Sequence, residues 1–375
     1  MSQTVTVLSI DGGGVRGLLA ASVLHDLIRR VRFLTAKAGR PSTRNRRAAA
    51  VEPSALFDLM AGTSTGALIV LGLTKPQPLD TRAMVEVYRT CAARIFPPGR
   101  FTALRQVRQA FAGKYDSEPY EAFLHELFGD VKLSDCNGNL LIAGYDIEGR
   151  KPFLFRKGPG VDKSYPDFLV RDVARATTAA PTFFEPACIG DLDGTLHTVT
   201  DGGLVANNPA LLAYVEARRI YPNARRFVIV SLGTGRSTQR FSYEAVRRWG
   251  YLDWVSPGRG VPLVAMMFDG QSRSVAEALT RLPQVEYHRI NCDLDQVSED
   301  IDDASESNID AIASLAKQLV HTYREQLHQV ALTLYRQRVL HRKLLLNARA
   351  PATGDDRNRV DVGDLPSVSP DDFGR

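Results

Sequence analysis

Two glycine-rich loops near the start of the chain carry residues whose types and spacing suit acyl transfer. The second loop reads GTSTG at residues 62–66, which places a serine between two glycines. A G-x-S-x-G sequence between a buried strand and a buried helix forms a nucleophile elbow, in which a strained turn exposes the serine hydroxyl. Apolar runs flank GTSTG on both sides. We therefore predict that Ser64 is a nucleophile and that Gly62 and Gly66 permit the turn.

The first loop, DGGGVRG at residues 11–17, follows an apolar run and precedes a helical pattern. Its glycines also fit G-x-G-x-x-G, the fingerprint of a dinucleotide-binding fold. That fold needs an acidic residue at the end of a second strand about 20 residues later, where this chain has a basic, proline-containing stretch. A Walker loop fails because no Gly-Lys-Ser/Thr follows. We expect the backbone N–H groups of Gly12, Gly13 and Gly14 to bind an oxyanion instead.

A serine nucleophile needs a base, and none of the seven histidines lies in an evident loop motif. Of these seven, only His288 is an alternative candidate for the base. Asp201 is the better candidate, because it follows a short apolar run and precedes two glycines in TDGGLVANNP. A carboxylate within hydrogen-bond distance can take the serine proton directly if burial tunes its basicity.

These motifs resemble the patatin-like phospholipase family. Four blocks occur in the family's order, and two shorter ones are also similar: DGGGVRG (11–17), GTSTG (62–66), ATTAAPTFFEP (176–186) and DGG (201–203), with NNPA (207–210) and SLGTG (231–235). The resemblance spans residues 5–330. It implies a catalytic dyad of Ser64 and Asp201, an oxyanion hole at Gly12, Gly13 and Gly14 with Arg16 close by, and lipid acyl hydrolysis that uses no metal and no other cofactor.

The elements that must position these residues alternate between strand and helix, which predicts an α/β fold with a mainly parallel sheet. The resemblance implies a three-layer α/β/α sandwich. We expect one domain over residues 1–346 and a disordered tail over 347–375, which is rich in Pro, Gly and Asp. The expected elements are a strand at 5–10 followed by a helix, a strand, turn and helix within 55–73, paired strands within 139–149 and 151–157, a helix after the NNP of 207–209, a strand within 226–235 and one long helix from about 308 to 346.

Composition excludes several classes of protein. The 375 residues are 44% hydrophobic and 24% charged with a net charge of +5, as in ordinary globular proteins. The sequence lacks any apolar run of about 18 residues, so no membrane-spanning helix is expected. Four dispersed cysteines without a C-x-x-C pair indicate reduced thiols. The first residues read as a strand and not as a signal peptide, which predicts a cytoplasmic protein, peripheral to the inner membrane when active.

Three segments allow two interpretations each. Residues 29–47 contain eight Lys or Arg and no acid, and form either a solvated loop or a contact with anionic lipid head groups. The stretch 249–268, rich in aromatic residues and Met, forms either core or the wall or lid of an acyl pocket. The basic end of the last helix, residues 336–343, either packs on the body or contacts a membrane surface.

The expected partner is a phospholipid membrane surface that supplies substrate. Nucleic acid is not expected as a partner, and an oligomer is possible. An alternative function uses the same core as an effector gated by a cyclic dinucleotide, similar to some bacterial patatin-like enzymes of antiphage defence. A third interpretation is a binding module with a dead site. The intact Ser64, Asp201 and glycine loop argue against it.

Overall fold

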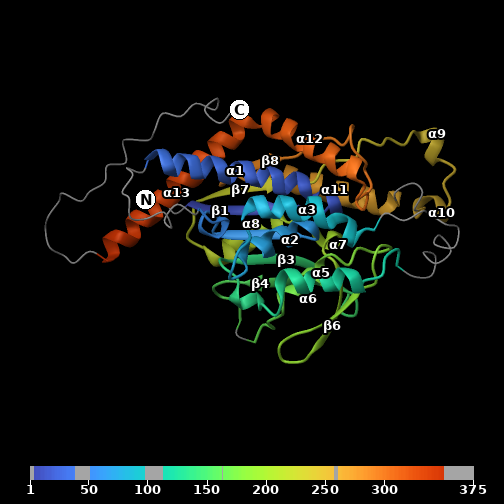
Figure 1. Cartoon of the computed structure of the whole chain (residues 1–375), viewed down its shortest axis with the longest axis horizontal. Coiled ribbons are helices and arrows are strands. Elements are labelled where there is room, and N and C mark those ends of the chain that lie inside the picture. Colours follow the sequence, from blue (N-terminus) through green and yellow to red (C-terminus); the bar gives the residue numbers. More distant parts are fainter. Residues whose placement is uncertain (1–3, 39–50, 98–112, 163, 257–260, 350–375) are drawn as a thin grey trace.

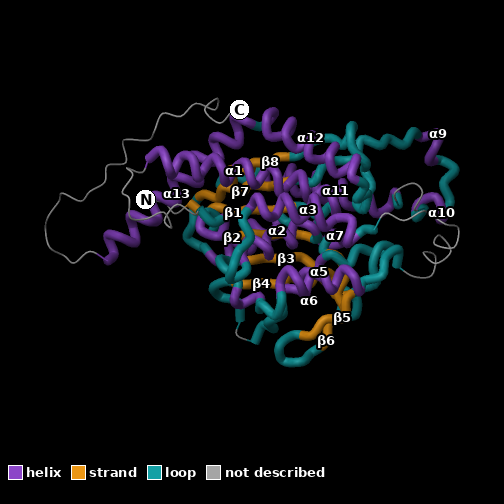
Figure 2. Tube along the Cα trace, in the orientation of Figure 1, coloured by secondary structure: helices purple, strands orange, loops and turns teal. Residues whose placement is uncertain are grey.

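An eight-stranded sheet lies at the centre of the computed structural model, which describes residues 4–38, 51–97, 113–162, 164–256 and 261–349 (Figure 1). Its order is β5-β6-β3-β2-β1-β7-β8, and β4 pairs with β3. Figure 2 shows the strands as a band that runs from β8 to β4. The strands are β1 (Thr4–Ile10), β2 (Leu59–Thr63), β3 (Leu140–Asp146), β4 (Lys151–Lys157), β5 (Ala187–Gly190), β6 (Leu196–Asp201), β7 (Arg226–Leu232) and β8 (Val285–Ile290).

Five neighbouring strands, β3, β2, β1, β7 and β8, are parallel, whereas β4, β5 and β6 join by antiparallel pairing. The central strands β1 and β7 are almost wholly buried, since helices cover both faces of a parallel sheet. The prediction of a mainly parallel sheet is confirmed.

The two faces of the sheet pack against different helices. On β1, Leu8 and Ile10 belong to one apolar core and Val5 and Val7 to another, because successive side chains of a strand point to opposite faces. The first core includes α1, α2, α3, α12 and α13, and the second includes α8 and α11. This arrangement is the expected three-layer α/β/α sandwich.

The described helices of this sandwich differ widely in length. They are α1 (Gly17–Ala38), α2 (Thr65–Thr74), α3 (Thr81–Ile95), α5 (Glu118–Phe128), α6 (Val170–Thr177), α7 (Gly203–Ala206), α8 (Ala210–Ile220), α9 (Tyr243–Val246), α10 (Tyr251–Trp254), α11 (Pro262–Thr280), α12 (Glu306–Thr322) and α13 (Arg324–Arg349), with short 3₁₀ turns at Gly14–Arg16, Pro53–Ala55 and Leu133–Asp135. Within the described ranges, no helix combines the length and apolarity needed to cross a membrane.

The interpretation of residues 29–47 as a solvated loop is wrong for its first part, because α1 continues to Ala38. Arg30 is only 3% exposed, and its Nε lies 2.5 Å from the Asp26 carboxylate one turn earlier. The apolar stripe of the helix continues through Val31 and Leu34, so the arginine beside it is buried and paired. Residues 39–47 of this basic segment lie outside the described residues.

The prediction of one helix over 308–346 is also wrong. Two helices, α12 and α13, replace it, and Tyr323 ends the first. The Tyr323 hydroxyl donates a hydrogen bond to the Asn291 carbonyl oxygen at 3.0 Å, which ties the junction to the end of β8. Of the expected tail, residues 347–349 still belong to α13, and residues 350–375 lie outside the described part.

Candidate active site

Ser64 occupies a sharp turn between the end of β2 and the start of α2. Its φ of 52° and ψ of −122° are unusual for a residue with a side chain. Such a conformation costs about 1–3 kcal/mol and persists where surrounding structure enforces it. The enforcing contacts are close: a Cβ on Gly66 would lie 2.2 Å from the Ile10 carbonyl oxygen, and one on Gly62 would lie 2.6 Å from the backbone of α2. The predicted elbow geometry is therefore present.

The strand order brings Ser64 to Asp201. β4 occupies one edge of β3 along its full length, so β2 and β6 share the other edge. β2 pairs with residues 140–143 and runs parallel to β3, whereas β6 pairs with residues 144–146 and runs antiparallel. The two strands thus meet end to end, each at its C-terminus. The Ser64 Oγ donates a hydrogen bond to Asp201 Oδ2 at 2.7 Å.

The Asp201 carboxylate is 3% exposed and has a second hydrogen bond, from the Gly203 N–H to Oδ1 at 2.7 Å. Burial raises the pKa of Asp201 to about 6, although the hydrogen bonds from Gly203 and Ser64 oppose the shift. The group is thus ionised at neutral pH but more basic than an ordinary carboxylate. A base of this kind suits proton transfer from a hydroxyl.

The glycine loop lies beside this pair, but its three N–H groups are not equivalent. The Gly12 N–H donates to the Asn207 carbonyl oxygen at 3.0 Å, so this predicted donor is used by the fold. Within the described part of the chain, the N–H groups of Gly13 and Gly14 have no hydrogen-bond partner. Both residues line the same cavity as Ser64. Two of the three expected donors are therefore available to a ligand.

Arg16, the fourth residue predicted at this loop, braces it from behind. Its Nε donates to the Gly13 carbonyl oxygen at 3.3 Å and its Nη1 to the Glu299 carbonyl oxygen at 3.1 Å. Burial lowers the pKa of Arg16 to about 10, which leaves the guanidinium charged at neutral pH. Its positive charge also lies near the loop that would hold an anion.

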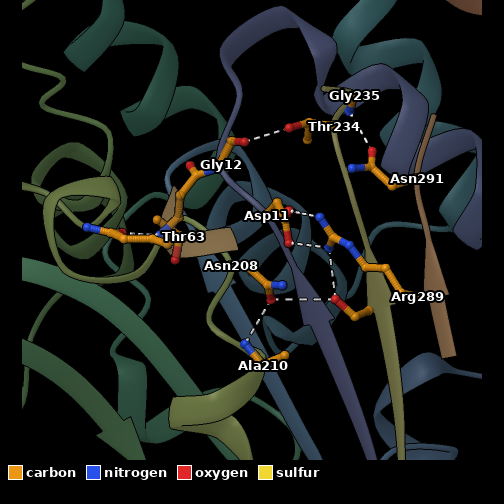
Figure 3. Close-up of polar contacts among 12 residues, drawn as sticks. Asp11, Gly12, Thr63, Asn208, Ala210, Thr234, Gly235, Arg289 and Asn291 are labelled. Atoms are coloured by element: carbon orange, nitrogen blue, oxygen red, sulfur yellow. Dashed lines mark hydrogen bonds and ion pairs between the residues drawn. The ribbon is translucent and has the colours of Figure 1, made fainter. Parts of the chain in front are cut away.

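Figure 3 shows a polar network behind the loop that the sequence did not reveal. Arg289 on β8 donates to both carboxylate oxygens of Asp11, at 2.8 and 2.5 Å, and to the Ser231 hydroxyl at 2.9 Å. The Thr234 hydroxyl donates to the Gly12 carbonyl oxygen at 2.6 Å. These bonds fix the end of β1 against β7 and β8. No sequence signal marked Arg289, because polar residues are common on an edge strand.

Thr177 is a second residue that sequence reasoning missed. Its hydroxyl accepts a hydrogen bond from the Ser64 N–H at 3.0 Å and donates one to the Ala143 carbonyl oxygen at 2.6 Å. It thus connects the elbow to β3. Thr177 lies in the ATTAAPTFFEP block, so the signal was present but carried no assigned role.

No histidine lies among the described residues that line the cavity. His288 lies on β8, where its Nε2 is 2.8 Å from the Glu286 carboxylate. The alternative base is therefore on a different part of the sheet from Ser64. The described residues also contain no group of three or more His, Cys, Asp or Glu side chains that could hold a metal ion.

The cavity around Ser64 has a volume of about 1280 Å³. Its apolar lining residues come from α2, α3, α5 and the segment after α6. Its polar lining residues include Arg16, Lys114 and acidic residues near 300. The stretch 249–268 supplies further apolar wall, as one of its two interpretations expected. Its described lining residues are Leu252, Val255, Val261, Val264, Ala265 and Phe268.

Residues 8–214 match the family model of the patatin-like phospholipases, which covers more than half of the chain. The chain belongs to this family. The match includes the glycine loop, the elbow and Asp201, and it implies lipid acyl hydrolase chemistry.

Curated relatives of the patatin-like family match most of this chain. Patatin-like protein 2 of Arabidopsis thaliana is 31% identical over 349 residues, which cover 84% of this chain and 83% of the relative. Patatin-like protein 2 of Oryza sativa subsp. indica is 28% identical over 85% of this chain and 84% of its own length. A potato relative, probable inactive patatin-3-Kuras 1, is 26% identical over 92% of this chain and 95% of its own. The crystal structure of VipD from Legionella pneumophila aligns at 10% identity over 84% of this chain and 67% of VipD, with a TM-score of 0.33.

Proposed function

We propose that this protein is a serine acyl hydrolase that cleaves acyl esters of phospholipids or related lipids into a free fatty acid and a lysolipid. One observation carries the proposal: the Ser64 hydroxyl is hydrogen-bonded to a buried carboxylate within a large, partly apolar cavity. The apolar part of the cavity suits an acyl chain, and the lipase chemistry implied by the family fits the same residues.

In the proposed mechanism, Ser64 Oγ attacks the ester carbonyl carbon while Asp201 Oδ2 takes the hydroxyl proton. The N–H groups of Gly13 and Gly14 bind the oxyanion of the tetrahedral intermediate. As this intermediate collapses, the proton on Asp201 passes to the leaving alkoxide, and the lysolipid departs. Water then attacks the acyl-enzyme with the help of Asp201, which releases the fatty acid and restores Ser64.

The test is hydrolysis of a chromogenic acyl ester by Ser64→Ala, Asp201→Asn and the double variant. Groups that act in one step are not additive, so each single variant should lose nearly as much activity as the double variant. Losses of at least about 10³ are expected. His288→Gln is the control and should retain activity. If Asp201→Asn keeps most activity, or if His288→Gln is as inactive as Ser64→Ala, the dyad is refuted.

A second candidate function adds regulation by a cyclic dinucleotide to the same chemistry, as in an antiphage-defence effector. The described residues contain no feature that favours it over an unregulated hydrolase. Incubation with mixed phospholipids, with and without cyclic dinucleotides, separates the two. Products identified by mass spectrometry in both arms support an unregulated hydrolase, and products in the nucleotide arm alone support the gated effector.

A further inference from the structure

Exposed apolar side chains gather in one short segment of the chain, on α9, α10 and the first turns of α11. The most exposed are Tyr251 (80%), Leu252 (77%) and Tyr243 (74%). With Leu263, Met266 and Met267 they make up six of the eleven large hydrophobic residues that are exposed in the described part of the chain. We call these six residues the apolar surface. Clustered exposed apolar residues mark interaction sites, whereas single ones are normal.

Both tryptophans of the chain lie in the same segment. Trp249 forms edge-to-face contacts with Phe241 and Trp254, at centroid distances of 4.8 and 5.0 Å. All three rings are half-buried and support the helices that carry Tyr243 and Tyr251. Trp and Tyr prefer the boundary between lipid and water, because their rings are apolar and each carries one polar group.

The apolar surface is continuous with the cavity that holds Ser64. Leu252 belongs to both, and its neighbours Val255 and Val264 line the cavity as well. Figure 1 shows α9 and α10 at one end of the molecule, beyond the sheet. Leu252, Val255 and Val264 therefore place apolar side chains where this surface meets the cavity.

The charges around the apolar surface are also those that favour an anionic membrane. Residues 236–256 contain four arginines and two acids. The acids are engaged locally: Glu244 pairs with Arg247 at 2.7 Å, and Asp253 accepts from the Gly250 N–H at 2.9 Å. Arg240 and Arg248 are exposed and have no acidic partner among the described residues. Each free arginine near an anionic bilayer strengthens binding.

We propose that the apolar surface, flanked by Arg240 and Arg248, docks on a lipid bilayer that contains anionic head groups and delivers lipid to the cavity. The binding itself does not require catalysis, although its purpose rests on the proposed hydrolase function. A second protein chain is the competing occupant. The continuity with an apolar cavity favours lipid, since a protein partner would seal the path by which a water-insoluble substrate enters.

The first test uses the full chain with Ser64→Ala as the parent, so that vesicles stay intact. Two variants of this parent are compared, and each carries three further substitutions. Tyr243→Ser/Tyr251→Ser/Met267→Gln removes part of the apolar surface and changes no residue that lines the cavity. The control, Leu192→Gln/Leu196→Gln/Val215→Thr, removes three exposed apolar residues elsewhere: Leu192 lies in the turn between β5 and β6, Leu196 on β6 and Val215 on α8. We measure co-sedimentation with vesicles of phosphatidylcholine and phosphatidylglycerol. The first variant should bind about tenfold more weakly or worse, and the control should bind like the parent.

Tryptophan emission is a local reporter, because both tryptophans lie in this segment. Vesicles should shift the emission to shorter wavelength in the parent and less in the first variant. Arg240→Gln/Arg248→Gln should weaken binding to anionic vesicles by about tenfold, with little change on phosphatidylcholine alone. Its matched control is Lys132→Gln/Arg225→Gln, which removes two exposed charges that precede β3 and β7.

Equal vesicle binding by the parent and the first variant would overturn the proposal, as would a parent that neither sediments with vesicles nor shifts its emission. A parent dimer that the first variant dissociates, without a change in vesicle binding, would assign the apolar surface to a second copy of the chain. Hydrolysis of a soluble chromogenic ester is measured separately with Ser64 restored. Failure there refutes the hydrolase function and leaves the binding result standing.

Discussion

At the scale of single residues, Asp201 combines two properties that oppose each other. It must be ionised to accept the Ser64 proton, yet it lies in a site where charge is poorly solvated. The pKa of about 6 is the outcome. A lower value would make the carboxylate a weaker base, and a much higher one would leave it protonated at neutral pH.

The pH dependence of hydrolysis should report this pKa. Below about pH 6 Asp201 binds a proton and cannot take another from Ser64, so kcat/KM should fall about tenfold for each further pH unit. The measurement is kcat/KM for a neutral chromogenic ester from pH 4.5 to about 8, with circular dichroism at each pH as the control for folding. A profile that stays flat down to pH 5 would contradict the assignment of Asp201 as base.

The same carboxylate should lower the stability of the fold at neutral pH. Its pKa is higher in the folded state than the ordinary value of 3.8, so the folded protein binds the extra proton between about pH 4 and 6. The free energy of unfolding therefore falls as pH rises through this window, and the loss persists above it. Asp201→Asn removes the buried charge, and its amide can still accept from Gly203 and donate to Ser64.

Asp201→Asn should thus unfold at a higher denaturant concentration than the parent at pH 7.5, with a gain of about 1–3 kcal/mol, and show no gain at pH 4. Equilibrium urea unfolding at the two pH values checks this. A variant that is less stable at both would mean that lost hydrogen bonds outweigh the relief of charge burial.

At the scale of elements, the glycine loop tolerates no side chain at Gly14. Its φ is +58°, and a Cβ would lie 1.9 Å from the Ile301 carbonyl oxygen, a backbone atom that cannot swing away. Gly14→Ala should reduce kcat by about 10²–10³ through loss of a positioned oxyanion donor. Gly194→Ala is a matched control, since Gly194 has a φ of +89° but nothing within 4 Å of its added Cβ. The Gly194→Ala variant should lose a little stability and keep its activity. Equal losses of kcat in the two variants would mean that the positive φ, and not the contact with Ile301, causes the loss.

Local patterns were sufficient for the elements that carry the site. The strand, elbow and helix around Ser64 and the pairing of β3 with β4 follow from apolar runs and turn residues, which act over a few positions. The end-to-end contact of β2 with β6 does not, because it depends on which strands share an edge of β3. The break at Tyr323 and the partner of Asp11 are likewise tertiary contacts. Sequence placed Ser64 and Asp201 in one site through co-occurring motifs, and the register explains why they meet.

At the scale of the whole molecule, the chemistry is expected to need no metal. Among the described residues, no group of three or more His, Cys, Asp or Glu side chains could hold a metal ion. The proposed proton transfer uses Ser64 and Asp201 alone. Extensive dialysis against a chelator should leave ester hydrolysis unchanged, with a known metallohydrolase treated in parallel as the control. Loss of activity that calcium or zinc restores would refute this expectation.

The shared edge of β3 also bears on how the protein is synthesised. Ser64 leaves the ribosome 137 residues before Asp201. At about 5–20 residues per second, this interval lasts about 7–27 seconds. Until β6 has emerged and paired with β3, the nascent polypeptide has a nucleophile but no base, and on the proposed mechanism it cannot cleave an ester. The order of the chain therefore keeps the elbow without its base until β6 has been synthesised and has paired with β3.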